Sequence, residues 1–272
     1  MTLPWTEAPR HALPAVLSDA TAAGVYWQAN DAALLLEAPG VARYMARAGE
    51  LVFAPLAAAD DATVKLYGAG LPVAAAWVQR GYLALHAAAV ATPAGAVVIA
   101  GASAAGKSVL AAALAARGCA LLADEVTPVA LDAPGGPAVL PQSDGALLLW
   151  PDAVAALGLA PERCAALRPG LGRCAVGGYA VAPAAPLRAV YLLAAHNGAD
   201  IQATPLTGRA RVLAVLAAAF NRFLPQPPAL RQQLFLQLSA QPGRAPVQRL
   251  LRPRVGWSAD ALAAHVLEDL AQ

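Results

Sequence analysis

The amino-acid sequence predicts an α/β fold, in which a mixed sheet with flanking helices follows a small β-rich region. Residues 1–72 contain short apolar runs separated by polar turns, a pattern typical of short strands. Residues 82–90 and 96–100 are longer apolar runs, as expected of buried strands, and helical segments alternate with further strands after them. We therefore expect a small N-terminal region over residues 1–72 and a larger α/β domain over residues 73–272.

The N-terminal region is expected to hold three short strands and one short helix. Polar residues separate its first two apolar runs, and two glycines and a proline break the chain at its end. In order, we expect strands at 25–27 and 34–36, a helix over 41–48, a strand at 51–53 and, after the break, a helix over 73–80.

The larger domain is expected to alternate strands and helices. Pro151 suits the first turn of a helix, and Ser258 suits the N-cap of the last one. Residues 161–178 are rich in Pro, Gly and Arg, which predicts a surface loop, and residues 225–228 predict a linker. We expect strands at 82–90, 96–100, 120–123, 126–131, 145–150, 187–194 and 247–251. We expect helices at 108–117, from 151 onward, and at 207–223, 230–238 and 258–270.

The composition argues against two classes of partner. Lys and Arg number 19 and Asp and Glu 17, so the net charge of +2 gives no reason to expect nucleic acid or an anionic membrane. The span between Arg80 and Lys107 contains no Asp, Glu, Lys or Arg and is long enough to cross a bilayer. Because Pro93 and Gly95 interrupt it, two buried strands joined by a turn explain this span better than a transmembrane helix.

The cysteines and the first residues bear on the cellular compartment. Cys119, Cys164 and Cys174 are odd in number and follow no metal-binding or redox spacing. The first seven residues show neither the basic start nor the apolar stretch of a signal peptide. We therefore expect reduced cysteines and a cytoplasmic protein.

One glycine-rich segment fits the pattern G-x-x-x-x-G-K-[ST] of a phosphate-binding P-loop. A strand precedes it and a helix follows it, so backbone N–H groups and the helix N-terminus can surround one anion. The lysine can then reach the β- and γ-phosphates of ATP, and the serine hydroxyl can hold Mg²⁺. The segment consists of Gly101, Ala102, Ser103, Ala104, Ala105, Gly106, Lys107 and Ser108.

Two acids follow the next buried strand. Asp124 and Glu125 come directly after the apolar run 120–123, at the kind of strand end where open α/β sheets bind ligands. A carboxylate at this place can hold Mg²⁺ or accept the proton of an attacking hydroxyl. We favour a functional pair over a strand end that merely reaches solvent.

His86 and three arginines are weaker candidates. A lone histidine in an apolar run is more often a hydrogen-bonded core residue, although a neutral imidazole near phosphate could donate to an oxygen or orient a carboxylate. Arg168, Arg173 and Arg222 could each contact phosphate, but solvated surface is the favoured interpretation for each.

The order of these motifs resembles the catalytic core of the HPr serine kinase/phosphorylase family. The similarity is closer to the HPr-kinase-like proteins encoded with ribosomally made peptides, including the lasso-peptide kinases, and it extends from about residue 25 to the end. The segments that carry the resemblance are Leu85-His86, Gly101 to Ser108, Ala123-Asp124-Glu125, Leu147 to Asp152 and Pro186 to Leu193.

The resemblance implies a P-loop kinase core related to phosphoenolpyruvate carboxykinase. Carried across by position, Asp124 would be the base toward the acceptor serine, and His86 would lie near the transferred phosphate. Ser108 and Glu125 would hold the metal. The implied activity is ATP- and Mg²⁺-dependent phosphorylation of a serine on a peptide or protein, with a lasso-type precursor peptide as substrate and a homo-oligomer as assembly.

Two other functions stay open from the sequence. A small-molecule kinase would need a pocket lined by several polar groups. A nucleotide-binding regulatory module without transfer activity is favoured by two departures from the family pattern, Ala104 in place of glycine and Glu125 in place of aspartate.

Overall fold

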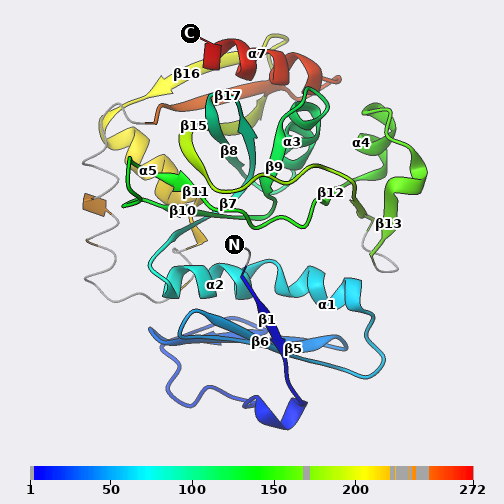
Figure 1. The fold of residues 1–272 in the computed structure, drawn as a ribbon, viewed down its shortest axis with the longest axis vertical. Coiled ribbons are helices and arrows are strands. Elements are labelled where there is room, and N and C mark those ends of the chain that lie inside the picture. Colours follow the sequence, from blue (N-terminus) through cyan, green and yellow to red (C-terminus); the bar gives the residue numbers. More distant parts are fainter. Residues whose placement is uncertain are drawn as a thin grey trace.

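The computed structural model is a mixed α/β structure with three sheets. Figure 1 shows the N-terminal sheet at one end, helices α1 (Asp61–Gly68) and α2 (Leu71–Gln79) above it, and the larger sheet with its own helices beyond them. The described residues are 3–167, 172–220, 224, 232, 235–236 and 245–271. The predicted linker at 225–228, most of the predicted helix 230–238, and Arg168 and Arg222 lie outside the described residues.

The N-terminal sheet has six strands in the order β1-β6-β5-β4-β3-β2. Strands β2 to β6 follow one another as antiparallel neighbours, and β1 joins the far edge parallel to β6. The predicted strands at 34–36 and 51–53 are confirmed, and that at 25–27 lies two residues later. The strands are β1 (Trp5–Glu7), β2 (Ala22–Ala23), β3 (Trp27–Ala29), β4 (Ala33–Ala38), β5 (Ala42–Arg47) and β6 (Glu50–Pro55), with the 3-10 turn η1 (Arg10–Ala12) after β1.

The helix predicted over 41–48 is wrong, because this segment forms β5. Its buried side chains alternate between two faces: Tyr44 belongs to the core under the helices, and Met45 packs in a smaller cluster on the opposite side. The next residues, Ala48 and Gly49, have φ of 51° and 77°, which is the backbone of a tight hairpin turn into β6. Alanine rarely adopts this conformation, so the turn was not apparent in the sequence.

Two helices connect the N-terminal sheet to the larger one. Helix α1 (Asp61–Gly68), which was not predicted, begins where the Asp60 carboxylate accepts a hydrogen bond from the Thr63 N–H at 2.8 Å. Helix α2 (Leu71–Gln79) confirms the helix predicted over 73–80 and is buried along most of its length. It packs on β4, β5 and β6 from one side and on β7 and β10 from the other (Figure 1).

The larger sheet has the order β11-β10-β7-β8-β15-β17-β16, and β9 also pairs with β7. Its centre, β8, β15 and β17, is parallel, whereas β7, β9, β10, β11 and β16 join antiparallel. The strands predicted in this sheet are confirmed, with no end shifted by more than two residues. The strands are β7 (Leu83–Thr92), β8 (Gly95–Gly101), β9 (Ala120–Ala123), β10 (Val126–Ala130), β11 (Ala138–Val139), β15 (Ala185–His196), β16 (Gln202–Leu206) and β17 (Val247–Pro253).

Helices cover both faces of this sheet. Helices α3 and α7 share a core with the inner strands on one face, while α5 packs on the other face against β7. The uncharged span before the P-loop forms β7 and β8, and no described helix is long and apolar enough to cross a bilayer. The helices are α3 (Lys107–Ala115), α4 (Pro151–Ala156), α5 (Gly208–Ala218) and α7 (Ala259–Ala271), with the 3-10 turn η2 (Pro161–Arg163) after α4.

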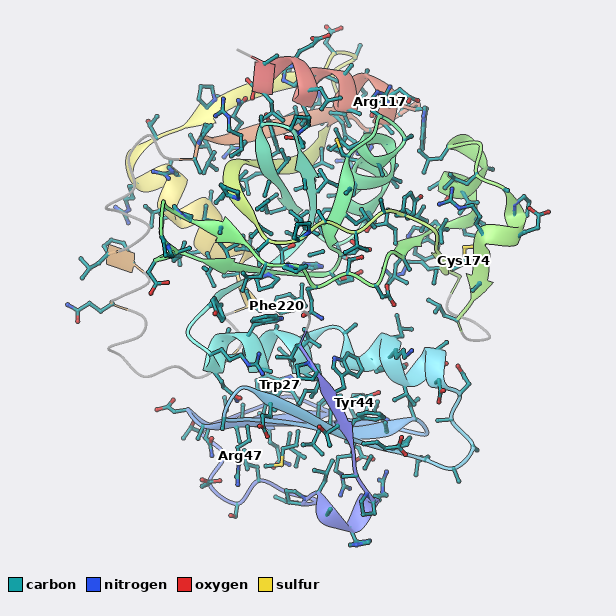
Figure 2. The ribbon with its side chains drawn as sticks, in the orientation of Figure 1. Trp27, Tyr44, Arg47, Arg117, Cys174 and Phe220 are labelled. Carbon is teal, nitrogen blue, oxygen red and sulfur yellow. A yellow bond between two sulfur atoms is a disulfide. The ribbon has the colours of Figure 1, made fainter. Side chains whose placement is uncertain are left out.

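The surface loop predicted over 161–178 instead contains a short hairpin. Strand β14 (Cys174–Val176) is the centre of a three-stranded sheet, with β13 (Cys164–Ala166) on one side and β12 (Leu147–Leu149) on the other, and Figure 2 shows Cys174 on this hairpin. Cys164 and Cys174 form a disulfide with Cα atoms 5.6 Å apart, and Cys119 is free and buried. The prediction of reduced cysteines is therefore wrong for this pair, which the hairpin brings together without any recognisable spacing in the sequence.

We expect Gly101→Ala to destabilise the protein, because the end of β8 lies too close to β15 for a side chain. A Cβ at Gly101, whose φ is 153°, would lie 2.3 Å from the Leu193 carbonyl oxygen. Unfolding in urea should show a loss of about 2–4 kcal/mol. Gly177→Ala is the control, since a Cβ there meets nothing within 4 Å. Equal stability of the two variants would contradict this close approach.

Candidate active site

The predicted P-loop connects β8 to α3 and curls tightly. The Ala105 N–H donates to the Ala102 carbonyl at 3.2 Å, and Ala104 and Gly106 have φ of 62° and 104°. Ala104 thus adopts the left-handed conformation that the family pattern assigns to glycine, at a cost of about 1–2 kcal/mol. No described side chain caps the start of α3, so its first N–H groups are left without a side-chain partner among the described residues. A helix N-terminus of this kind favours an anion.

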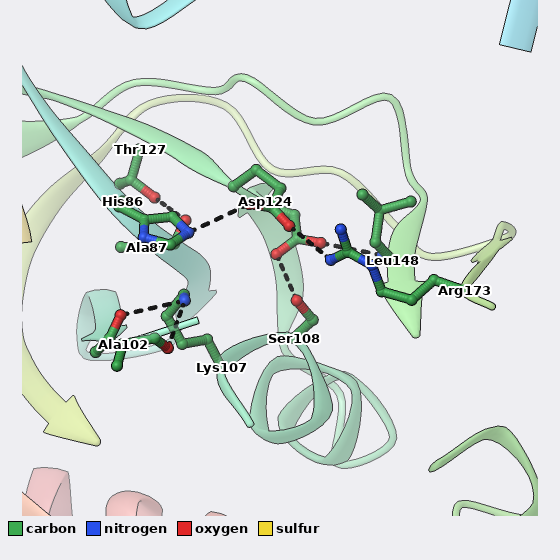
Figure 3. A network of polar contacts seen from close by, with 11 residues as sticks. His86, Ala87, Ala102, Lys107, Ser108, Asp124, Thr127, Leu148 and Arg173 are labelled. Atoms are coloured by element: carbon green, nitrogen blue, oxygen red, sulfur yellow. Dashed lines mark hydrogen bonds and ion pairs between the residues drawn. The ribbon is translucent and has the colours of Figure 1, made fainter. Parts of the chain in front are cut away.

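Lys107 is a buried cation inside the loop. Its ammonium group donates to the carbonyl oxygens of Gly101 and Ala102 at 3.2 and 3.1 Å, and only 7% of the residue is exposed (Figure 3). Burial lowers the pKa of the ammonium group, since the charged form loses hydration. Two neutral carbonyls compensate a buried charge only in part, so the arrangement favours a bound anion such as phosphate.

The two acids lie at a break between strands that pair with the same neighbour. Strands β9 and β10 are both antiparallel to β7, and Asp124 and Glu125 fill the gap between them. Glu125 has a φ of 65°, so the chain turns sharply there. As a result the two carboxylates have different partners: Asp124 contacts Ser108 on α3 (Figure 3), and Glu125 contacts His86 on β7.

Asp124 is bound to the P-loop helix. Its Oδ1 accepts a hydrogen bond from the Ser108 hydroxyl at 2.8 Å, and its Oδ2 accepts one from the Leu148 N–H at 3.1 Å. Burial raises the pKa of Asp124 to about 6, and the neighbouring charge of Glu125 contributes in the same direction. Asp124 and Ser108 therefore place two oxygen ligands next to each other. The charge on the Asp124 carboxylate has no cationic hydrogen-bond partner among the described residues.

Glu125 has a partner on each side, an imidazole and a guanidinium. His86 Nε2 lies 3.3 Å from its Oε2, and the Arg173 guanidinium donates to its Oε1 at 3.2 Å. The hydrogen bond from His86 is the main cause of a lowered pKa for Glu125, and the charges of His86, Arg173 and Lys107 add to it. Arg173, predicted to be solvated surface, is instead half-buried in an ion pair, and His86 lies beside a carboxylate.

A cavity of about 480 Å³ opens over the loop and the acids, within the size range of small-molecule sites. Lys107, Ser108, His86, Glu125 and Arg173 line it. The structure thus brings together the P-loop, His86 and Glu125 in one cavity, with Asp124 bonded to Ser108 at its edge.

Arg252 is a site residue that the sequence did not reveal. It lies near the end of β17, its Nε donates to the Ala105 carbonyl at 2.9 Å, and it lines the same cavity. A basic residue at the end of an apolar strand could have indicated it. Arg249 and Arg254 are close by and equally basic, so this pattern does not single out Arg252. Only the sheet order places Arg252 against the loop.

The donor set fits a metal that arrives with a nucleotide. Among the described residues, no group of three or more His, Cys, Asp or Glu side chains could hold a metal ion. Mg²⁺ is usually held by one or two protein oxygens together with phosphates and waters. The Ser108 hydroxyl and the Asp124 carboxylate supply two such oxygens beside the phosphate loop.

Comparisons with known proteins leave the family open. No family model and no curated protein matches this chain. Among solved structures, the HPr(Ser) kinase/phosphatase from Coxiella burnetii is similar, with 15% identity over 68% of this chain and 94% of that chain. The TM-score is 0.34.

The two acids should have opposite effects on stability. The pKa of Asp124 is raised from 3.8 to about 6. Its contribution to the free energy of unfolding is therefore complete below pH 4 and is lost as pH rises through 6. We therefore expect Asp124→Asn to stabilise the free protein at pH 8 by about 1–3 kcal/mol and to have little effect at pH 4.

Glu125→Gln is the matched comparison. The pKa of Glu125 is lowered, so its contribution is present above its ordinary value of 4.5 and is lost as pH falls through the lowered one. This variant should melt at a lower temperature than the native protein at pH 8. Thermal unfolding at both pH values tests the pair, and a lower melting temperature for Asp124→Asn at pH 8 would contradict the cost assigned to its ionised form.

Proposed function

We propose that the protein is an ATP-dependent phosphotransferase that phosphorylates a serine hydroxyl on a peptide or protein. The observation that carries the proposal is the hydrogen bond from Ser108 to Asp124, next to the buried Lys107. It joins a phosphate-binding loop to a carboxylate in the arrangement that metal-assisted phosphoryl transfer requires.

The loop residues would bind and orient the phosphates. The N–H groups at the start of α3 and the ammonium group of Lys107 supply donors and positive charge, and Arg252 fixes the Ala105 carbonyl. Mg²⁺ bound with the nucleotide would neutralise charge on the transferred phosphoryl group. Alignment and charge neutralisation account for most of the catalysis in such reactions.

The two carboxylates would divide the remaining tasks. The sequence resemblance gives the base to Asp124 and a metal-binding role to Glu125, and the raised pKa of Asp124 suits a proton acceptor. The contacts favour the opposite assignment, with the metal at Asp124 and the base at Glu125. Asp124 bonds to Ser108, while Glu125 lines the cavity beside His86. We give more weight to the contacts, since the hydroxyl must come within hydrogen-bond distance of its base.

In this assignment Glu125 accepts or orients the hydroxyl proton of the acceptor. The hydroxyl oxygen would form a bond to the γ-phosphorus while the bond to the β-phosphate oxygen breaks, and the proton would pass to the carboxylate. His86 and Arg173 hold Glu125 in place from both sides. Serine on a ribosomally made precursor peptide is the acceptor that the sequence resemblance favours.

Lys107→Ala should abolish nucleotide binding, because it removes the charge inside the loop. Calorimetric titration with ATP and Mg²⁺ measures this. Lys65→Ala is the control, since Lys65 is the other lysine of the chain and lies exposed on α1. Unchanged ATP affinity of Lys107→Ala would overturn the assignment of the loop.

Transfer of label from the γ-phosphate of ATP to serine-containing peptides tests the chemistry. Glu125→Gln and Asp124→Asn should each reduce transfer at least 100-fold. Asp124→Asn should also weaken the dependence on Mg²⁺, whereas Glu125→Gln should leave it intact; the opposite pattern would restore the base to Asp124. Label found only on small molecules, or ATP binding without any transfer, would favour the small-molecule kinase or the regulatory module.

A further inference from the structure

The cavity over the P-loop continues into an apolar end that phosphate does not need. Val109 from α3 and Leu262 from α7 line it, together with Trp257 from the connection between β17 and α7. Trp257 is 44% exposed, so a large indole surface is left open to the cavity. Aromatic surface of this size next to a polar site is typical of a place where a ring is bound.

The indole of Trp257 is held in position by both neighbouring helices. Its Nε1 donates to Asp260 Oδ2 at 3.1 Å, and Asp260 Oδ1 pairs with the Arg117 guanidinium, also at 3.1 Å. Arg117 follows α3 and Asp260 lies in the first turn of α7; Figure 2 shows Arg117 close to α7. The edge of the ring is therefore fixed while the ring keeps an exposed surface, which is a pre-organised arrangement for stacking.

The order of the strands gives the direction of a bound nucleotide. Across the sheet the strands lie in the order β7, β8, β15, β17. The P-loop follows β8, Glu125 lies beside β7, and Trp257 comes after β17. The loop thus lies between the acids and Trp257. Because the γ-phosphate must face the acids, the opposite end of the nucleotide points toward Trp257.

The second exposed tryptophan of the cavity, Trp150, lies at the acid end. It follows β12, whose Leu148 N–H bonds to Asp124, and its ring lies against Gly172 next to Arg173. Trp150 therefore belongs to the side where the acceptor enters. The two tryptophans are distinguished by their place in the sheet order rather than by their exposure.

We propose that Trp257, with Val109 and Leu262, binds the purine ring of the nucleotide whose phosphates occupy the P-loop. This inference rests on the proposed function, since it assumes a nucleotide in the loop. It assigns a site of aromatic stacking and apolar contact to the β17–α7 connection and the start of α7, in addition to the phosphate site. Contacts of this kind discriminate a nucleoside triphosphate from an inorganic polyphosphate.

Comparison of two ligands tests the proposal. The native protein, Trp257→Ala and Trp257→Phe are titrated by calorimetry with ATP and, separately, with inorganic tripolyphosphate, each with Mg²⁺. Trp257→Ala should weaken ATP binding about tenfold or more and leave the affinity for tripolyphosphate within twofold of the native value. Trp257→Phe should retain most of the ATP affinity, because it keeps a ring. Tyr26→Ala is the control and should bind ATP as the native protein does, because Tyr26 is an exposed aromatic residue that does not line the cavity.

Indole fluorescence gives a readout that does not depend on affinity. ATP should quench part of the emission of the native protein and of Tyr26→Ala, and this change should be lost in Trp257→Phe. Unchanged ATP affinity of Trp257→Ala, or an equal loss for ATP and tripolyphosphate, would overturn the purine site. A native protein that binds neither ligand, or a Lys107→Ala variant that still binds tripolyphosphate normally, would instead overturn the proposed function.

Discussion

The pairing of β7 is the interaction on which the site depends. On one edge β7 pairs with β8, which leads into the P-loop, and on the other edge it pairs first with β9 and then with β10. His86 lies on β7 opposite Val126, and Val126 is the residue that follows Glu125. A slip of one residue would turn His86 to the other face and separate it from Glu125. Three alanines without exposed surface, Ala87 to Ala89, let the layers on both faces pack closely here.

The site contains more charge than it neutralises by itself. Glu125 is satisfied by His86 and Arg173, whereas Asp124, among the described residues, accepts hydrogen bonds only from uncharged groups and has a raised pKa. Lys107 donates to neutral carbonyls and has a lowered pKa. An anion at the lysine and a cation at Asp124 would relieve both costs together. Binding of a metal–phosphate pair should therefore be cooperative, since each charge is buried less favourably without the other.

Local patterns predicted the centre of the site but not its surroundings. The P-loop, the acids and the strands beside them were apparent because each is encoded within a few consecutive residues. The hairpin that pairs Cys164 with Cys174, and the contact of Arg252 with the loop, depend on residues that only the tertiary fold brings together. The alanines of segment 41–48 favour a helix, and the positive φ of Ala48 has no sequence pattern. Arg173 directly precedes Cys174, which begins β14 and forms the disulfide. The same hairpin therefore also carries a partner of Glu125.

The contact between Arg252 and Ala105 has a consequence for the order in which the molecule is completed. It spans 147 residues. During synthesis at about 5–20 residues per second, the P-loop segment would leave the ribosome on the order of 10 s before the strand that steadies it. Until then β15 would lack its neighbour β17, and α3 would lack the apolar cover of α7. A nascent chain would expose this apolar surface through that interval, which is the period when chaperone protection matters most.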